Sequence, residues 1–211
     1  AAIPARATIR YDVSLAQPSQ HLLHVTMTIP DAQGSVAVQM AAWDALYQIR
    51  DFAHRVSNFR ATGAAGAPLS ILRVDKQTWR VTNTSAGGPS EVRIEYDTYW
   101  DEPGPFGTQV NSQHAFLNLA MVLCYLPERR AEDVTVHFAD MPTGWSAALE
   151  LPEASTSQGK AAATYASATY TAGNYDALVD APVEIGQFDE LRFQAGGRPI
   201  RVVLHGDSVN R

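Results

Sequence analysis

The chain has 211 residues, of which 45% are hydrophobic and 18% are charged, and its formal net charge is -6. These values suit a globular protein with a sizeable core. The negative charge argues against a nucleic-acid surface, which needs clustered Lys and Arg, and no apolar run reaches the roughly 20 residues needed to cross a membrane. The only cysteine, Cys124, excludes a disulfide framework and a cysteine-based metal site; it lies in an apolar run and is expected to be a buried small hydrophobe.

The first residues, AAIPARAT, lack the basic and apolar regions of a signal peptide. They leave open whether residue 1 follows a cleaved signal or is the boundary of a fragment. A lone cysteine fits a reducing cytoplasm and is compatible with the periplasm. The sequence therefore leaves the compartment open between periplasmic or secreted and cytoplasmic.

Apolar and polar residues alternate with a period of two through most of the chain, which predicts half-buried strands. Pro, Gly, Asn and Asp residues between these segments predict turns. The strands expected, in chain order, are residues 7–15, 21–29, 36–40, 69–74, 78–82, 92–100, 134–138, 145–151, about 165–170, 191–195 and 200–205. Pro30 and Asp31 are expected to end the second of them, and the last two are expected to complete the sheet as a hairpin closed near Gly196 and Gly197.

The run HAFLNLAMVLCYL at 114–126 fits either a buried helix or a strand buried on both faces, and its surroundings favour a long central strand. Residues 176–179 are expected to form one helical turn that ends before Pro182, since a residue preceding proline avoids the α region. Around a dozen strands without an amphipathic helix of ordinary length predict an all-β fold. The expected form is a large antiparallel β-sandwich, a single domain over 1–211 with at most one or two short helical turns.

No catalytic or metal-binding pattern is visible in the sequence. The H-E-x-x-H motif of a zinc peptidase places two His on one helical face with a Glu beside the bound water, and none of the six histidines fits it. His21 and His24 lie three residues apart on a predicted strand, so their side chains should point to opposite faces. A G-x-S-x-G nucleophile turn is also missing. The sequence therefore predicts no catalytic residue and no metal ligand in this chain.

Three stretches carry more specific patterns. Within the segment 43–59, WDALYQIRDFAHRVSNF, the pattern Y-x-I-R-D-F-A-x-x-V-x-x-F runs from Tyr47 to Phe59. Residues 74–81 read V-D-K-x-T-W-R-V, and residues 175–186 read Y-D-x-L-V-D-x-P-V-E-I-G. Together they resemble the N-terminal domain of the glycyl aminopeptidase family of zinc metallopeptidases (metallopeptidase family 61).

The resemblance covers nearly the whole chain and implies one domain of a longer protein. In the family this domain precedes a thermolysin-like catalytic domain that holds the zinc, often followed by a PDZ domain, and the full-length enzymes remove N-terminal Gly or Ala. Neither downstream domain is in this chain, which is expected to end about where a catalytic domain would begin. The resemblance thus implies a domain without cofactor or catalysis of its own, which packs against its own catalytic domain and helps to wall a cleft for peptide N-termini.

Five residues are candidates for this cleft or for the domain interface: Tyr47, Arg50, Asp51, Phe52 and Asp180. Arg presents a planar fork of donors that suits a carboxylate, and Tyr combines an apolar ring with a polar tip. The alternative role is structural. Arg50 and Asp51 would then form an internal pair in an irregular loop, Tyr47 and Phe52 would fill the core, and Asp180 would brace a turn.

The chain departs from the family at residues 44–46, where Asp-Ala-Leu replaces the usual Pro-Gly-Ser and changes which backbone angles are accessible. Two further functions are alternatives, and the departure at 44–46 bears on the first of them. One is the domain of a degenerate, inactive relative. The other is a free-standing module that binds peptide or carbohydrate, which exposed Trp43, Trp100 or Trp145 on one sheet face would support.

Overall fold

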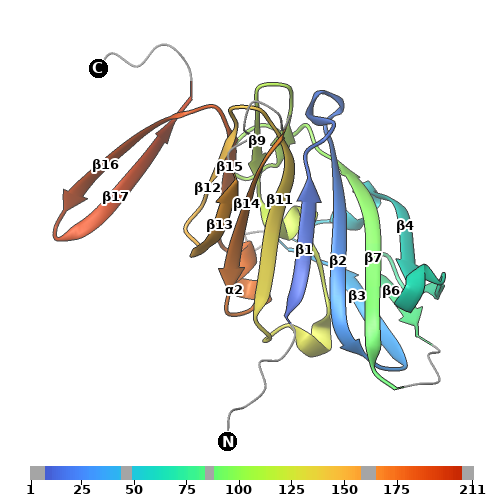
Figure 1. Cartoon of the computed structure of the whole chain (residues 1–211). Helices are drawn as coiled ribbons and strands as arrows, with labels where there is room; N and C mark the ends of the chain where they lie inside the picture. Colours follow the sequence, from blue (N-terminus) through green and yellow to red (C-terminus); the bar gives the residue numbers. More distant parts are fainter. Residues whose placement is uncertain (1–7, 44–48, 84–87, 158–164, 206–211) are drawn as a thin grey trace, which may run out of the picture.

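The computed structural model describes residues 8–43, 49–83, 88–157 and 165–205. Its largest sheet has seven strands, which Figure 1 shows side by side. In spatial order they are β13 (Glu153–Ser157), β14 (Tyr165–Ala172), β11 (Val134–Pro142), β1 (Ile9–Ser14), β2 (Leu22–Ala32), β7 (Ser90–Tyr99) and β4 (Val56–Thr62). The alternation in the sequence gives this sheet one apolar face: β1 buries Ile9, Tyr11 and Val13 and exposes Arg10.

Neighbouring strands of this sheet are antiparallel except β1 and β11, which run parallel with Ile9 opposite Val134. The expected end of β2 at Pro30 and Asp31 is wrong. The strand continues to Ala32 through a shift of register against β7. Such an irregularity lets a proline remain in a strand without breaking the ladder on both sides.

Two four-stranded sheets form the second layer. One has the order β10 (Cys124–Tyr125), β3 (Ser35–Met40), β6 (Thr78–Thr82) and β5 (Ser70–Arg73), and the other has the order β12 (Ser146–Ala148), β15 (Val183–Gly186), β9 (His114–Leu117) and β8 (Gln109–Val110). Phe59 of β4 stacks on Trp79 of β6 with ring centroids 4.6 Å apart. Tyr170 of β14 donates its hydroxyl to the carbonyl of Ala147 on β12 at 3.0 Å. These contacts join the layers and confirm the predicted all-β sandwich.

Helices are few and short in the described part of the chain. They are α1 (Leu119–Val122) and α2 (Tyr175–Val179), with 3-10 turns η1 (Pro18–Gln20), η2 (Phe52–Arg55), η3 (Ala64–Gly66) and η4 (Pro127–Arg129). The side chain of Asn174 caps α2 by accepting from the Ala177 N–H at 2.7 Å, which confirms the predicted helical turn. Among the described residues, no helix has both the length and the apolar character that a bilayer span requires.

The long central strand predicted over 114–126 is wrong. The chain there forms β9, then the single turn α1, then the two-residue β10, and nearly all of it is buried. An apolar run without a period fits strand and helix equally, so hydrophobicity alone could not divide it. The segment is divided into separate elements because its buried backbone N–H and C=O groups do not pair in one continuous strand ladder and need other hydrogen-bond partners.

Three buried tyrosines supply those partners. The hydroxyls of Tyr11 on β1, Tyr96 on β7 and Tyr175 at the start of α2 donate to the carbonyls of Cys124, Val122 and Leu123 at 2.9, 2.9 and 2.7 Å. The Tyr96 hydroxyl also accepts from the Cys124 N–H at 2.9 Å. The large sheet and α2 therefore hold this buried segment through side chains, and we call the three residues the tyrosine cluster.

Cys124 lies among these hydroxyls and is fully buried, which confirms its expected role as a small core residue. Burial raises the pKa of its thiol to about 12. Because the thiolate is the reactive form, we expect no reaction of the native chain with Ellman's reagent at pH 8 and one equivalent in denaturing urea. Rapid modification of the native chain would contradict this placement.

The last two strands, β16 (Asp189–Ala195) and β17 (Arg198–Leu204), form the predicted hairpin. Its two-residue turn has Gly196 at φ 58° and Gly197 at φ 75°, the left-handed angles that such a turn needs and glycine tolerates. The expectation that it completes the main sheet is wrong: it is a separate two-stranded sheet that projects from the body in Figure 1. Leu191 and Phe193 on it are half exposed.

Candidate functional site

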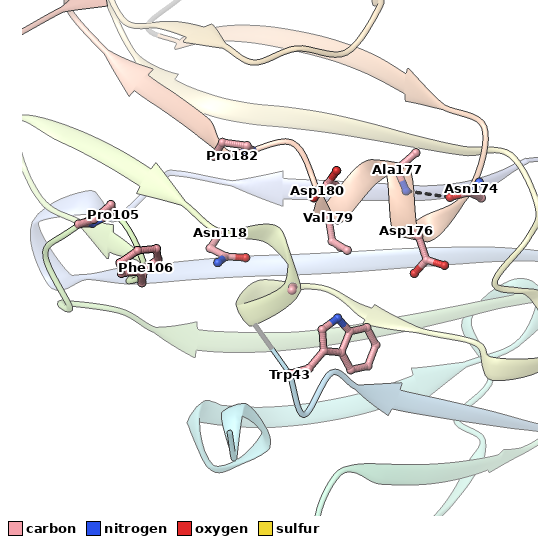
Figure 2. A pocket seen from close by; sticks show the side chains of 11 residues that line it. Trp43, Pro105, Phe106, Asn118, Asn174, Asp176, Ala177, Val179, Asp180 and Pro182 are labelled. Carbon is pink, nitrogen blue, oxygen red and sulfur yellow. Dashed lines mark hydrogen bonds between the residues drawn. The ribbon is translucent and has the colours of Figure 1, made fainter. Parts of the chain in front are cut away.

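A groove of about 560 Å³ lies where the end of β3, the β7–β8 loop and α2 meet. Figure 2 shows Trp43 on one side of it, α2 with Asp176 and Asp180 on the other, and Phe106 toward one end. Its lining is Trp43, Pro105, Phe106, Asn118, Ala120, Asn174, Asp176, Ala177, Val179, Asp180 and Pro182. The groove thus combines aromatic and aliphatic surface with carboxylate and amide groups.

Arg130 connects the two sides of this groove. Its guanidinium lies 4.8 Å from the centre of the Trp43 ring, and its Nε donates to Asp176 Oδ1 at 2.7 Å. The Asp176 carboxylate raises the pKa of Arg130 through this hydrogen bond. Trp43 also packs edge-on against Tyr125, with centroids 5.6 Å apart. This role of Arg130 could not be predicted from the sequence, where the residue is only one of two adjacent basic residues among acidic neighbours.

Among the predicted site residues that the structure describes, Asp180 lines the groove. It follows α2 directly, and its N–H donates to the Asp176 carbonyl at 3.0 Å. Its carboxylate is exposed and makes no hydrogen bond or ion pair within the described ranges. A groove that contains both carboxylates and aromatic rings suits a cationic group such as an amine.

The other described candidates are not among the residues that line the groove. Arg50 reaches Glu102 of the β7–β8 loop at 3.8 Å, and its guanidinium is 5.8 Å from the centre of the Phe52 ring. Asp51 is exposed and precedes η2. Phe52 is buried and packs edge-on against Trp100 with centroids 6.1 Å apart, as the structural alternative expects. Arg50 therefore contacts the loop that also carries Phe106.

Tyr47 and the departure at residues 44–46 lie outside the described residues, so their predicted roles stay predictions. Of the tryptophans weighed for a free-standing binding module, Trp100 and Trp145 are buried and Trp43 is half-buried. These three indoles therefore do not form an exposed aromatic platform on a sheet face.

A second group of side chains could not be recognised from the sequence pattern. His114, Glu184 and His205 converge at the base of the projecting hairpin. Ligand spacing on one helix does not identify these residues, because His114 and Glu184 lie on the paired strands β9 and β15 and His205 follows β17. A sequence signal for such a cluster requires the strand pairing to be known first.

Comparison with solved structures shows the same fold in parts of larger zinc-peptidase relatives. An aminopeptidase N family protein from Idiomarina loihiensis matches with a TM-score of 0.83 and 23% identity, over 95% of this chain and 33% of that protein. An M1 zinc metallopeptidase variant from Deinococcus radiodurans, bound to a Tyr-Ser-Ala substrate, matches with a TM-score of 0.54 and 13% identity, over 92% of this chain and 45% of that one. The chain thus spans about a third to less than half of these proteins.

No curated protein gives a significant match to the sequence. A family model does: the one described as the Peptidase M61 N-terminal domain matches residues 10–187. This match includes all three motifs and most of both layers of the sandwich, and it confirms the resemblance read from the sequence. The chain belongs to the Peptidase M61 N-terminal domain family.

Proposed function

We propose that this chain is a non-catalytic domain of a glycyl aminopeptidase-like zinc metallopeptidase, that it packs on the catalytic domain, and that its groove helps to shape the substrate cleft. Membership of the family supports the first part of this proposal. In the proposal the zinc and the reacting groups belong to the catalytic domain. The domain formed by this chain contributes part of the wall of the substrate cleft.

The apolar side chains around the groove support an interface role. Ile49 is 94% exposed and pairs by a β-bridge with Trp43, which lines the groove, and Phe106 at the groove is 51% exposed. Large apolar side chains gathered beside a groove indicate a surface that another protein surface covers. This gathering is the observation that carries the proposal.

The acidic residues of the groove support a role near the substrate. Asp176 is neutralised in part by Arg130, whereas Asp180 also lines the groove and is exposed, with its carboxylate turned away from Trp43 in Figure 2. An aminopeptidase must accommodate the free amino group of its substrate. We propose that Asp180 adds negative potential to the part of the cleft wall that attracts this amine.

The interface is tested by producing this chain and the catalytic portion of the same protein separately and measuring their association by calorimetry. Phe106→Asp is expected to weaken association by about tenfold or more, because it places a charge in an apolar contact. In a separate hydrolysis assay, the chain alone is expected to leave Gly-Ala intact, and the pair formed by the chain and the catalytic portion is expected to cleave it.

Leu72→Asp is the matched control. Leu72 is 62% exposed on β5, the edge strand that β6 separates from β3, so the change adds the same charge away from the residues that line the groove. Its association constant is expected to equal that of the parent chain. Equal effects of the two substitutions would reject the groove as the interface, and Gly-Ala turnover by the chain alone would reject the non-catalytic role.

A further inference from the structure

The residues His114, Glu184 and His205, which we call the His-Glu-His cluster, offer three ligand atoms at one point. Glu184 Oε1 lies 3.1 Å from His114 Nδ1 and 2.8 Å from His205 Nε2, and all three ligand atoms lie within 4.8 Å of one another. Their side chains are 30%, 22% and 33% exposed, in the order His114, Glu184, His205. They line a groove of about 790 Å³, separate from the one at Trp43, so an ion can reach them from solvent.

Sheet register explains how the first two meet. In the antiparallel pair of β9 and β15, His114 lies opposite Gly186 and Glu184 lies opposite Phe116. Side chains two residues apart share a face of a strand, so Glu184 and His114 are diagonal neighbours on one face. Long side chains at such positions reach each other.

The third residue comes from the projecting hairpin. The chain leaves β15 at Gly186, enters β16 at Asp189 and returns along β17 to Leu204, which pairs with Asp189. His205 therefore comes back over the end of β15. Its ring centroid lies 5.3 Å from that of His114 and 5.8 Å from that of Phe188, which packs against it edge-on.

Gly186 makes room for this arrangement. A Cβ atom at residue 186 would lie 2.9 Å from His205 Cε1 and 3.2 Å from His114 Cβ. Both contacts are closer than carbon atoms ordinarily approach, so any side chain here would push the His205 ring away. The convergence of the two histidines on Glu184 thus depends on glycine at this position.

We propose that the His-Glu-His cluster binds a divalent transition-metal ion of the zinc type, which fastens the base of the β16–β17 hairpin to the β9–β15 sheet. Imidazole nitrogen and carboxylate oxygen are zinc ligands with bonds of about 2.0–2.1 Å, which places tetrahedral ligands about 3.4 Å apart. The distances of 3.1 and 2.8 Å from Glu184 Oε1 need to widen by about 0.3 and 0.6 Å, while the two histidine nitrogens, which lie within 4.8 Å of each other, close around the ion. A water molecule from the groove completes the coordination.

The same three groups also satisfy one another without a metal ion: Glu184 accepts a hydrogen bond from His114 and lies at ion-pair distance from His205. The two states make opposite predictions. A metal ion draws all three ligands to one centre and holds the hairpin base, whereas the hydrogen-bonded triad leaves added metal without effect. The proposal concerns this chain alone and does not depend on its role beside a catalytic domain.

The test is a zinc titration of the untagged 211-residue chain after treatment with a chelator. Isothermal calorimetry is expected to give one site per chain, and the melting temperature is expected to rise with zinc concentration, since an ion that binds only the folded state stabilises it. Cobalt in place of zinc is expected to give the visible absorption bands of a low-symmetry, few-coordinate site. Absence of saturable 1:1 binding would overturn the proposal.

Two variants remove ligands, and one displaces a ligand. Glu184→Gln and His205→Ala are each expected to weaken zinc binding by about 100-fold or more, since losing even a partner of a ligand costs 10–100-fold. Gly186→Ala keeps all three ligands and is expected to weaken binding about tenfold by moving His205.

His137→Ala is the control, because His137 bonds to Thr169 within the seven-stranded sheet, outside the cluster. It is expected to bind zinc as the parent chain does. His205 follows the last strand and is exposed, so His205→Ala should fold even if Glu184→Gln or Gly186→Ala does not. Parental zinc affinity in His205→Ala, or an equal loss in His137→Ala, would overturn the assignment.

Discussion

Above about pH 10, the free energy of unfolding is expected to fall by up to about 5 kcal/mol for each further pH unit. Four buried groups cause this fall, because each one that keeps its proton in the folded chain and loses it in the unfolded chain contributes about 1.4 kcal/mol per pH unit. The groups are the tyrosine cluster and Cys124, all completely buried. Burial is the largest cause that raises each pKa: to about 12 for Cys124, and well above the ordinary 10.0 for the three tyrosines. Because these groups also contact one another, ionisation of one opposes ionisation of the next.

The sign follows from where the protons are held. Below pH 9 both the folded and the unfolded chain keep these protons, and the stabilisation is complete. As the pH rises through the ordinary values of 9.0 for the thiol and 10.0 for the phenols, the unfolded chain releases them while the folded chain retains them. Unfolding is then favoured, and a domain with a net stability of about 5–15 kcal/mol should unfold within one to three pH units.

Urea unfolding at a series of pH values between 8 and 12, together with tyrosinate absorbance at 295 nm, measures this effect. The absorbance of the native chain should rise first from the exposed tyrosines, and the buried ones should ionise only as the chain unfolds. Tyr170, whose pKa burial raises to about 12, adds to the same loss. If the free energy of unfolding fell above pH 10 with a slope that corresponds to the release of one proton or fewer on unfolding, the tyrosine cluster would have to ionise in the folded state.

Much of the sandwich could be predicted from the sequence because its strands are half-buried. The alternation of β7 is complete, with Val92, Ile94 and Tyr96 buried and their neighbours less so, and turn residues bound the β5–β6 hairpin. The motif residues also identified the family. Local pattern is sufficient where one face of a strand meets the core and the other meets water.

Prediction failed where long-range contacts decide local structure. The segment 114–126 is mostly buried and its hydrophobicity has no clear period, and the tyrosines that hold it are distant in sequence, as Tyr11 is 113 residues from Cys124. The candidate sites depend on the same kind of information. Arg130 meets Trp43, and His205 meets Glu184, only once the sheets and the hairpin are placed. Such contacts follow from register and layer packing, which composition does not contain.

Tyr96→Phe is expected to be among the most destabilising conservative substitutions in the chain, at about 2–5 kcal/mol. The change removes only an oxygen atom, yet that oxygen donates to the Val122 carbonyl and accepts from the Cys124 N–H, both at 2.9 Å. Both backbone groups lie in a completely buried segment, so water does not replace the lost partner. A buried polar group left unpaired costs about 1–3 kcal/mol, and this substitution leaves two such groups, the Val122 carbonyl and the Cys124 N–H, without their partner.

The midpoint of urea unfolding measures this cost, provided that the slope of the transition stays constant. Tyr99→Phe is the matched control: Tyr99 ends the same strand with 46% of its surface exposed, and its change should stay within about 0.5 kcal/mol. The variant also links the two predictions, since removing one buried phenol should lower the alkaline slope by about 1.4 kcal/mol per pH unit. If Tyr96→Phe were as stable as Tyr99→Phe, the backbone groups of residues 122–124 would have hydrogen-bond partners other than the tyrosine cluster. The tyrosine cluster would then not explain why residues 114–126 form two short strands and a helical turn in place of one long strand.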